Sequence, residues 1–545
     1  MPPGLLLLPA ALLLGGWRYA PLAAVGGVAV WALAAVERPL LWPAAAWLPW
    51  LAWAAVSAGF GLQPAAGLEP LSRWASAVAF LALASSWDTR ARAAWLKTVV
   101  LVTPVLAVAA IATGAGRGFV GHMTGLIPPY YNYTAFALAA GASAAAAWLT
   151  CADAPRGRWR AAALAAAISG PAAIFLARSR GALLGLFAAV FLLSARRWGR
   201  RTVFVCALGV VMASVLWKSG LVPASLYGVA TKRYRPYPEL RPQIWTAAVR
   251  IADDHPWLGV GPGCFGVAFR RRPIPSQGAA RWGFSTDYAH SELLQAAAET
   301  GWVGLALWLA AAASALRGVF APPASAAEAA ASAAVVAMSA QLAFDDMLQI
   351  PGLAFLFLSA AAVCLPRRPF GRRLPVAAAT LGAALALVSL LPRVLARRDP
   401  ALGAALYPAD ANRVEDLAYA REAAGRAAQA DALWAQASRL APFDAVYPWR
   451  RAQIAAACGN WDRTEAFAAQ AVSLEPGFVA ARLLRVVAHF HLGRPEQARR
   501  EADALARELA SRPRLDIRSG YESAIWDYDP AELARVRALV GARAR

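Results

Sequence analysis

Long apolar segments recur along the first 395 residues of the chain. Each runs for about 17 to 22 residues without an interior charge, the length that an α-helix needs to cross a bilayer core. Arginine clusters or prolines separate the segments. The pattern predicts roughly thirteen membrane-spanning helices, near residues 4–16, 20–36, 40–60, 71–87, 98–114, 132–151, 160–177, 181–195, 202–222, 301–316, 329–344, 352–366 and 374–392.

Composition agrees with a membrane protein. Of 545 residues, 59% are hydrophobic and only 16% are charged, and the mean hydropathy is +0.45. These values are outside the range of ordinary soluble proteins. We expect the first segment to stay as a membrane helix, because Trp17 and Arg18 follow it where a signal peptide would have small residues. The predicted fold class is all-α, with residues 1–395 forming a polytopic transmembrane helical bundle.

Basic residues orient the predicted bundle. Short cytoplasmic loops carry an excess of Lys and Arg. Counting spans from a cytoplasmic N-terminus places all the basic clusters on one side: Arg90, Arg92 and Lys97; Arg156, Arg158 and Arg160; Arg196, Arg197, Arg200 and Arg201; Arg317; and Arg367, Arg368, Arg372 and Arg373. The opposite side then receives the loop 114–131, the turn at Arg178–Arg180, a long loop over 223–290, the turn at Asp345 and Asp346, and everything after residue 393.

Residues 396–545 follow a 34-residue period. Pro408, Pro442 and Pro476 are spaced by 34, and so are Gly425, Gly459 and Gly493. This double register predicts a soluble tetratricopeptide-type domain of about three helix pairs, with a terminal helix near 530–543. Such domains bind peptides or proteins, so a protein partner is one expectation, and a simple stabilising cap is the alternative.

The net charge of +22 does not predict nucleic-acid binding, because topology and anionic lipid account for much of it. The loop 223–290 is different, with nine Lys or Arg against four acidic residues. A basic surface outside the membrane suits an anionic, lipid-linked substrate such as a pyrophosphate. The five Cys and five His have no metal-ligand or disulfide spacing, so we expect no metal, no cofactor and no disulfide framework.

Several ordered motifs resemble the signature of the O-antigen ligase and polymerase superfamily. The motifs are Pro129-Tyr-Tyr-Asn132 with Ala135; Ser179-Arg180-Gly181; Arg241-Pro-Gln-Ile-Trp245; His255-Pro-Trp-Leu-Gly259-Val-Gly261-Pro-Gly263; Ala289-His290-Ser-Glu-Leu-Leu-Gln295; and Glu299-Thr-Gly301. Ser291 stands where the family commonly has Asn. Some members of this superfamily also carry a tetratricopeptide tail.

The resemblance implies a GT-C-like glycosyltransferase of the bacterial inner membrane, with a periplasmic C-terminal domain. It would move a glycan from undecaprenyl pyrophosphate to an acceptor on the periplasmic face, without a metal. A ligase would use lipid A core or a protein as acceptor, and a polymerase would use a growing lipid-linked glycan.

The resemblance and the chemistry of the side chains together select the candidate substrate-binding residues. Arg180 lies at a membrane boundary, where its planar guanidinium can hold two pyrophosphate oxygens. Arg241 begins a predicted helix over 242–252, where an anion would offset the cost of a basic residue at a helix N-terminus. Arg178 is a weaker candidate, because it lacks the family match and snorkelling explains it as well. Asn132 is included on its motif.

His290 is the predicted catalytic base. Imidazole titrates near neutral pH and can take the proton of an attacking sugar hydroxyl, which would give inversion at the anomeric carbon. Either Tyr288 or Asp287 is expected to fix its tautomer, and Tyr288 is also a candidate substrate-binding residue.

Other polar residues receive supporting roles. His255 and the glycines after it are interpreted as a turn that positions the loop. We expect Glu299 to cap or orient the start of the next span. Asp345 or Asp346 is expected to contact a sugar or one of the arginines.

Two other functional classes stay open. A transporter would have ionisable residues buried in the middle of its spans, and few are found here. A membrane scaffold would use the repeats to recruit partners and keep an inert bundle.

Overall fold

The structure is a computed structural model with helical architecture. It describes residues 3–14, 19–115, 131–177, 179–199, 201, 240–274, 280–367, 371–512 and 520–542. Within these ranges every secondary-structure element is a helix, apart from one isolated β-bridge between Leu40 and Arg373. The predicted all-α fold class is confirmed.

Contacts divide the chain into two compact units. The first unit comprises Met1–Tyr234, Ile244–Gly263 and Tyr288–Leu391, and the second comprises Arg235–Gln243, Cys264–Asp287 and Pro392–Arg545. Two segments that precede residue 290 in the sequence therefore belong with the C-terminal helices.

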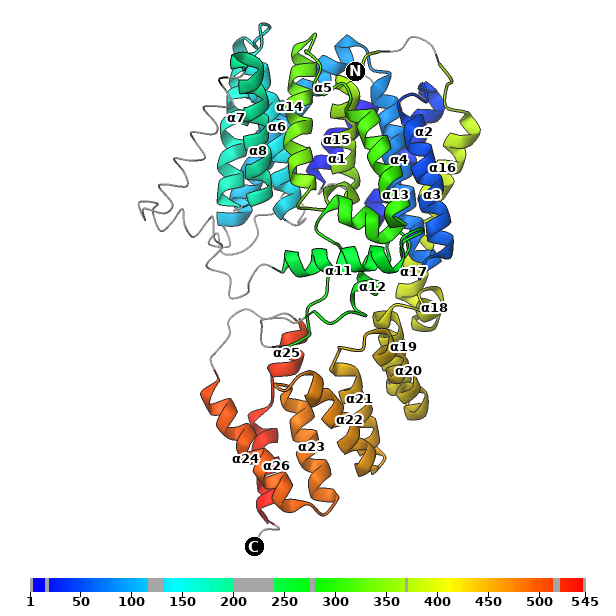
Figure 1. Ribbon diagram of the computed structural model, residues 1–545, viewed down its shortest axis with the longest axis vertical. Coiled ribbons are helices and arrows are strands. Elements are labelled where there is room, and N and C mark those ends of the chain that lie inside the picture. The colour runs from blue at the N-terminus through cyan, green and yellow to red at the C-terminus, as the bar shows by residue number, and fades with distance from the viewer. Residues whose placement is uncertain are drawn as a thin grey trace. The chain divides into compact units, whose positions relative to one another are not determined.

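The first unit is a bundle of mostly apolar helices (Figure 1). Its helices are α1 (Pro3–Leu13), α2 (Ala20–Glu37), η2 (Ala44–Trp47), α3 (Leu48–Phe60), α4 (Pro64–Ser85), α5 (Thr89–Ala115), α6 (Tyr131–Thr150), α7 (Gly157–Leu176), α8 (Arg180–Trp198), most of α11 (Arg241–Asp254), α13 (Glu292–Leu316), α14 (Ala326–Leu342), η3 (Met347–Gln349), α15 (Pro351–Cys364) and α16 (Val376–Val388). In the described part of the chain, seven helices are long and apolar enough to cross a membrane. The chain is thus a multi-pass membrane protein.

The helices correspond to the predicted spans but differ from them at several ends: α4 and α5, for example, begin before the predicted residues 71 and 98. The segment 40–60 becomes helical only at Ala44, because Pro39 and Pro43 interrupt its start. The segment 301–316 is longer than predicted and begins at Glu292. The last segment divides into α16 and α17 (Leu391–Arg398). The segment 202–222 lies outside the described residues.

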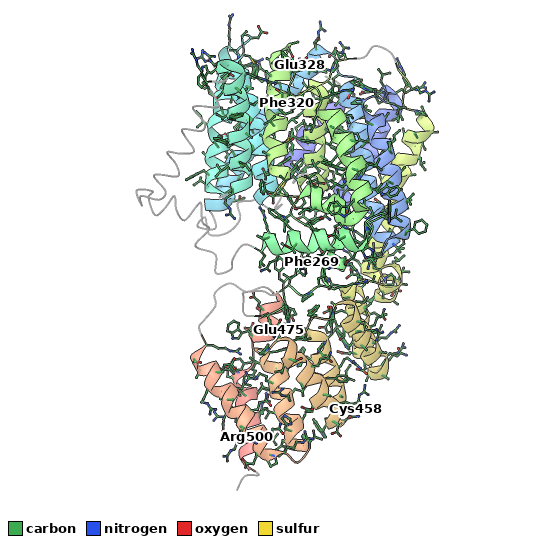
Figure 2. The ribbon with its side chains drawn as sticks, in the orientation of Figure 1. Phe269, Phe320, Glu328, Cys458, Glu475 and Arg500 are labelled. Atoms are coloured by element: carbon green, nitrogen blue, oxygen red, sulfur yellow. The ribbon has the colours of Figure 1, made fainter. Side chains whose placement is uncertain are left out.

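Arginines from two different helices lie at one end of the first unit. Arg92 of α5 donates hydrogen bonds to the carbonyls of Val363 and Leu365, at 2.9 and 3.0 Å, and lies 3.7 Å from Glu328 of α14. Arg196 of α8 donates to Ser332 of the same helix α14 at 2.7 Å. Glu328 marks this end of the bundle in Figure 2. Arg92 and Arg196, which the charge pattern assigns to one side, therefore both contact α14 at the same end of the bundle.

The second unit is built from helix hairpins. Its C-terminal helices are α18 (Pro400–Leu406), α19 (Ala411–Ala423), α20 (Ala427–Leu440), α21 (Val446–Ala457), α22 (Trp461–Leu474), α23 (Val479–His491), α24 (Pro495–Ser511), α25 (Gly520–Trp526) and α26 (Pro530–Ala542). The turns inside the three successive hairpins α19/α20, α21/α22 and α23/α24 contain Gly425, Gly459 and Gly493, with φ between 70° and 73°. The 34-residue period is therefore the period of these hairpins, and the terminal helix α26 lies where it was predicted.

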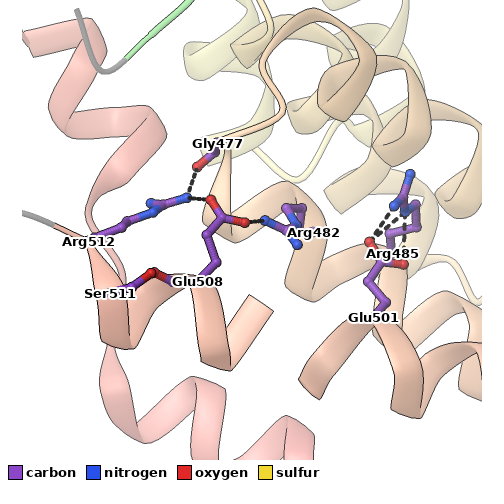
Figure 3. Close-up of polar contacts among 7 residues, drawn as sticks. All are labelled: Gly477, Arg482, Arg485, Glu501, Glu508, Ser511 and Arg512. Atoms are coloured by element: carbon purple, nitrogen blue, oxygen red, sulfur yellow. Dashed lines mark hydrogen bonds and ion pairs between the residues drawn. The ribbon is translucent and has the colours of Figure 1, made fainter. Parts of the chain in front are cut away.

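Ion pairs join neighbouring helices of the last hairpin. Glu508 of α24 accepts a hydrogen bond from Arg482 of α23 and another from Arg512, at 2.7 Å for Arg512 (Figure 3). Arg485 binds both carboxylate oxygens of Glu501, at 2.9 and 3.1 Å from its Nε. All the residues in these contacts belong to the last hairpin or directly follow it, so the contacts stabilise the hairpin without a residue of the first unit.

A break in α13 separates its first turns from the rest of the helix. Gly301 has φ 73° and ψ 175°, a conformation that favours glycine strongly. A Cβ atom at residue 301 would lie 2.3 Å from the carbonyl oxygen of Trp257. Gly259 is equally confined, since a Cβ atom there would lie 2.3 Å from the carbonyl carbon of Glu299. The loop 256–263 and the break in α13 are therefore in backbone contact.

Hydrogen bonds fasten this contact. Three backbone N–H groups donate across it, from Val260 to Ala298, from Gly261 to Glu299 and from Trp302 to Pro256, at 2.9 to 3.0 Å. The C-terminal end of α3 joins them, because the Ser57 hydroxyl donates to the Glu299 carbonyl at 2.9 Å and the Trp53 indole donates to the Thr300 carbonyl at 3.0 Å. We call residues 256–263 and 298–302 together the glycine clamp.

The glycine clamp predicts a large effect of Gly301→Ala on stability. Alanine at a positive φ costs about 1–2 kcal/mol, and the clash with Trp257 adds to that cost. Gly157→Ala is the matched control, because Gly157 also has a positive φ of 53° but a Cβ atom there would meet no atom within 4 Å. In detergent, Gly301→Ala should lower the midpoint of thermal unfolding, followed by tryptophan fluorescence, by several degrees more than Gly157→Ala. Equal shifts would contradict the clamp.

Candidate functional site

His290 occupies an unusual backbone position just before α13. Its φ is 52°, and among the described non-glycine residues only Arg38 shares a positive φ. Such strain persists only where the surrounding structure enforces it, and it is frequent at functional sites. The residue is therefore placed by its neighbours and not by its own conformational preference.

A relay of side chains holds the backbone beside His290. The Ala289 N–H donates to Gln295 Oε1 at 2.7 Å, and Gln295 Nε2 donates to Glu299 Oε1 at 2.8 Å. Glu299 Oε1 also accepts the Gly263 N–H at 2.9 Å. Glu299 thus links the loop before His290 to the glycine clamp, which gives a concrete form to the orienting role expected for it.

Asp346 is the carboxylate partner of the His290 ring. His290 Nδ1 lies 3.2 Å from Asp346 Oδ1, and the Asp346 side chain is almost fully buried while a quarter of the His290 side chain is exposed. A carboxylate can only accept, so this contact assigns the proton of the neutral ring to Nδ1 and leaves the Nε2 lone pair free of that proton. The second oxygen, Asp346 Oδ2, is buried and makes no hydrogen bond within the described residues.

This finding corrects the expected origin of the orienting group. Asp287 is not that group: its side chain is 75% exposed, and it lies 3.8 Å from Arg270. Tyr288 is partly buried, two residues before His290. The carboxylate comes instead from a turn 56 residues further along the chain.

Glu292 fixes the turn that carries Asp346. This buried residue begins α13, and its carboxylate accepts the Leu348 N–H at 3.3 Å and Gln349 Nε2 at 2.9 Å. Leu348 and Gln349 form η3, which follows Asp346 directly. His290 and Glu292 therefore hold the same short turn from two points.

The N-terminus of α8 reaches the same place. Arg180 is the first residue of α8 and is exposed. A Cβ atom on the next residue, Gly181, would lie 3.3 Å from Asp345 Oδ2, so the first turn of α8 packs against Asp345. Asp345 is 1% exposed and neighbours Asp346 in the sequence. The positive end of a helix dipole together with an arginine is a favourable place for an anion.

Helix α11 contributes an aromatic contact. The Trp245 indole donates to the His290 carbonyl at 3.3 Å, and its ring centroid lies 6.0 Å from that of Phe344. Arg241 begins α11 four residues earlier, and residues four apart lie on the same face of a helix. Arg241 thus projects from the face of α11 that also carries Trp245.

The remaining candidates are placed only in part. Asn132 lies in the first turn of α6, and its side chain lies outside what is described. Arg178 is outside the described residues. His255 is exposed, and its carbonyl accepts the Gly259 N–H at 2.9 Å, so His255 belongs to the turn that starts the glycine clamp.

His290, Asp345 and Asp346 also have the composition of a cation site. One ligand atom from each of them lies within 4.8 Å of the others. A carboxylate pair with an imidazole can hold a divalent ion. This grouping could not be predicted from spacing along the chain, because His290 lies 55 residues before the pair Asp345 and Asp346.

Sequence reasoning did not find the roles of Asp346, Glu292 and Trp245. Asp346 did carry a signal, since Asp345 and Asp346 interrupt an otherwise apolar stretch. A carboxylate pair at the end of a membrane helix is costly and is a functional candidate for that reason. Its partner could not be identified without the fold.

Comparison with known families now bears on this geometry. The family model described as O-Antigen ligase matches residues 162–309. None of the curated proteins matches the chain. The matched stretch includes Arg180, Arg241 and His290, while Asp345 and Asp346 lie beyond its end. Over residues 162–309, the chain is thus similar to the O-antigen ligase family.

Proposed function

We propose that this protein is a membrane glycosyltransferase that moves a glycan from undecaprenyl pyrophosphate to an acceptor hydroxyl on the periplasmic face, with His290 as the general base. The observation that carries the proposal is the contact between His290 Nδ1 and the buried Asp346 carboxylate, beside the N-terminus of α8. The family match supports the class of reaction.

The proposed step is a single displacement. The acceptor oxygen attacks the anomeric carbon, its proton passes to His290 Nε2, and the bond from that carbon to the phosphate oxygen breaks. Undecaprenyl pyrophosphate leaves with the electron pair of that bond, and the anomeric centre is inverted. Asp346 stabilises the imidazolium that forms and keeps Nε2 directed at the hydroxyl, as a carboxylate does for a catalytic histidine in general.

Arginine side chains supply the positive charge for the pyrophosphate. Arg180 offers its guanidinium at the N-terminus of α8, and the guanidinium and the positive end of the helix dipole both stabilise the charge on the leaving group. Arg241 provides a second phosphate contact from α11. In this proposal no metal ion takes part in the transfer.

Ligase and polymerase share this chemistry and differ in the acceptor. The acceptor is a lipid A core or a protein for a ligase, and a growing lipid-linked glycan for a polymerase. The product distinguishes the two, because a polymerase makes a ladder of longer donor-linked chains and a ligase makes a single modified acceptor.

Loss of the base or of the phosphate contact should abolish transfer. In proteoliposomes supplied with an undecaprenyl-pyrophosphate oligosaccharide and either acceptor, His290→Ala should reduce the rate by about 10²- to 10⁴-fold. Arg180→Ala should have a comparable effect, while Arg197→Ala, at the opposite end of α8, should retain wild-type activity. Wild-type rates from the His290 variant would refute the proposed base.

Asp346→Asn tests the tautomer argument. Asparagine keeps the shape of the side chain but can donate to Nδ1, which would move the ring proton to Nε2 and block base catalysis. We expect the rate to fall by at least about 10²-fold with little change in the KM for the donor. Asp153→Asn, at an exposed residue in another loop, is the control. A change confined to KM would contradict this role of Asp346.

Chelation separates base catalysis from cation catalysis. With charge supplied by Arg180 and Arg241, treatment with EDTA should leave the transfer rate unchanged. A loss that Mg²⁺ or Mn²⁺ restores would mean that His290, Asp345 and Asp346 hold a cation, and it would overturn the metal-independent mechanism.

A further inference from the structure

A segment of the chain just before His290 is docked within the second unit. Ala280 is fully buried in an apolar cluster with Ala445, Ala471, Phe478, Ala481 and Ile525. Residues 280–283 come from the loop that follows α12 (Phe265–Phe269), whereas the rest of that cluster comes from the hairpin repeats and α25. We call residues 280–283 the docked segment.

Glu475 binds the backbone of the docked segment. Its carboxylate oxygens accept the N–H groups of Arg281 and Trp282, the latter at 2.6 Å. Glu475 is 1% exposed and is labelled in Figure 2. Two N–H groups on one buried carboxylate are charge-assisted hydrogen bonds, which are roughly twice as strong as neutral ones.

Side chains of the repeats close around the docked segment. The Trp282 ring lies 5.5 Å from the Phe443 ring, centroid to centroid. Gly283 lies against Tyr521, so closely that a Cβ atom on residue 283 would be 1.9 Å from Cδ1 of the tyrosine ring. The Tyr521 hydroxyl hydrogen bonds to Glu475 and accepts the Ala445 N–H at 3.0 Å. Burial raises the pKa of Glu475, and the N–H groups of Arg281 and Trp282 oppose that shift.

The repeat period indicates that the hairpin fold does not itself require this carboxylate. Glu475 precedes Pro476, and the residues at the same place in the two preceding repeats are Ala441, before Pro442, and Tyr407, before Pro408. Ala441 and Glu475 each follow the second helix of a hairpin, whereas Tyr407 follows α18, and two of the three residues are uncharged. A glutamate is present only in the repeat that binds the docked segment.

We propose that the helix hairpins of the second unit bind the docked segment and thereby fix the position of the loop that carries His290. In this role Glu475 is a positioning residue for transfer. His290 follows Trp282 by eight residues in the sequence. The inference rests on the proposed function, since positioning matters only if His290 takes part in the reaction. It gives the domain a partner within the same polypeptide.

The docking is tested first by proteolysis, which needs no activity. Trypsin cleaves after arginine, and the Arg281–Trp282 bond has its flanking N–H groups held by Glu475. Cleavage of a protected bond follows the population of the opened loop. In the full-length protein in detergent, Glu475→Ala should speed cleavage after Arg281, read by mass spectrometry, by at least about tenfold. Alanine is also the residue at the same place in the preceding repeat, Ala441, so the substitution is compatible with the hairpin fold.

Two further variants separate docking from folding. Glu508→Ala removes a carboxylate from the same domain that pairs with Arg482 and Arg512, and it should leave cleavage after Arg281 unchanged. Gly283→Ala disturbs the contact from the loop side, by displacing the Tyr521 ring, and it should reproduce the Glu475→Ala pattern while every repeat residue stays native. Far-ultraviolet circular dichroism should be the same for all three variants.

The positioning role is tested by transfer kinetics. Because a displacement of about 1 Å can cost 10²-fold in rate, we expect Glu475→Ala and Gly283→Ala to lower kcat by about 10- to 100-fold. The KM for the donor should stay within about twofold, since the arginines that bind the pyrophosphate are intact. Faster cleavage with an unchanged kcat, or no change in either measurement, would overturn the inference. Absence of transfer by the wild-type protein would instead refute the proposed function, and the proteolysis result would still decide the docking.

Discussion

Backbone contact at the glycine clamp is the constraint on which the rest of the site depends. Gly259 and Gly301 let two main chains approach to a distance that no side chain would tolerate. The resulting break at Gly301 separates residues 292–300 from the rest of α13. These residues form a short polar helix that carries Glu292, Gln295 and Glu299. Each of these side chains then holds another part of the site: the loop before His290, the turn after Asp346, or the clamp itself.

Two energetically unfavourable features lie next to this polar helix. His290 adopts a positive φ, and Asp346 is a buried carboxylate with one oxygen lacking a hydrogen bond. Both features are unfavourable in isolation. Strained backbone and costly buried polar groups cluster at functional sites in general, so both features support the proposed role of His290.

Much of the fold could be predicted from local patterns, whereas the site could be predicted only in part. Apolar length predicted the spans, and the 34-residue spacing among the prolines and among the glycines predicted the hairpins, because both patterns are present along the chain itself. The predicted span began at residue 301, whereas α13 begins at Glu292, because its polar first turns are buried by tertiary contacts that periodicity does not contain. His290 and Arg180 were found through their motifs, but the Asp346 partner lies 56 residues away and depends on how helices pack.

The discontinuity of the second unit has a consequence for biogenesis. Glu475 is separated from the segment that it binds by 193 residues, among them several apolar helices. At about 5–20 residues per second, a ribosome needs on the order of 10–40 s to make that stretch. During this interval residues 280–283 have left the ribosome without their binding site, so assembly of the second unit can finish only after the last hairpins have been synthesised.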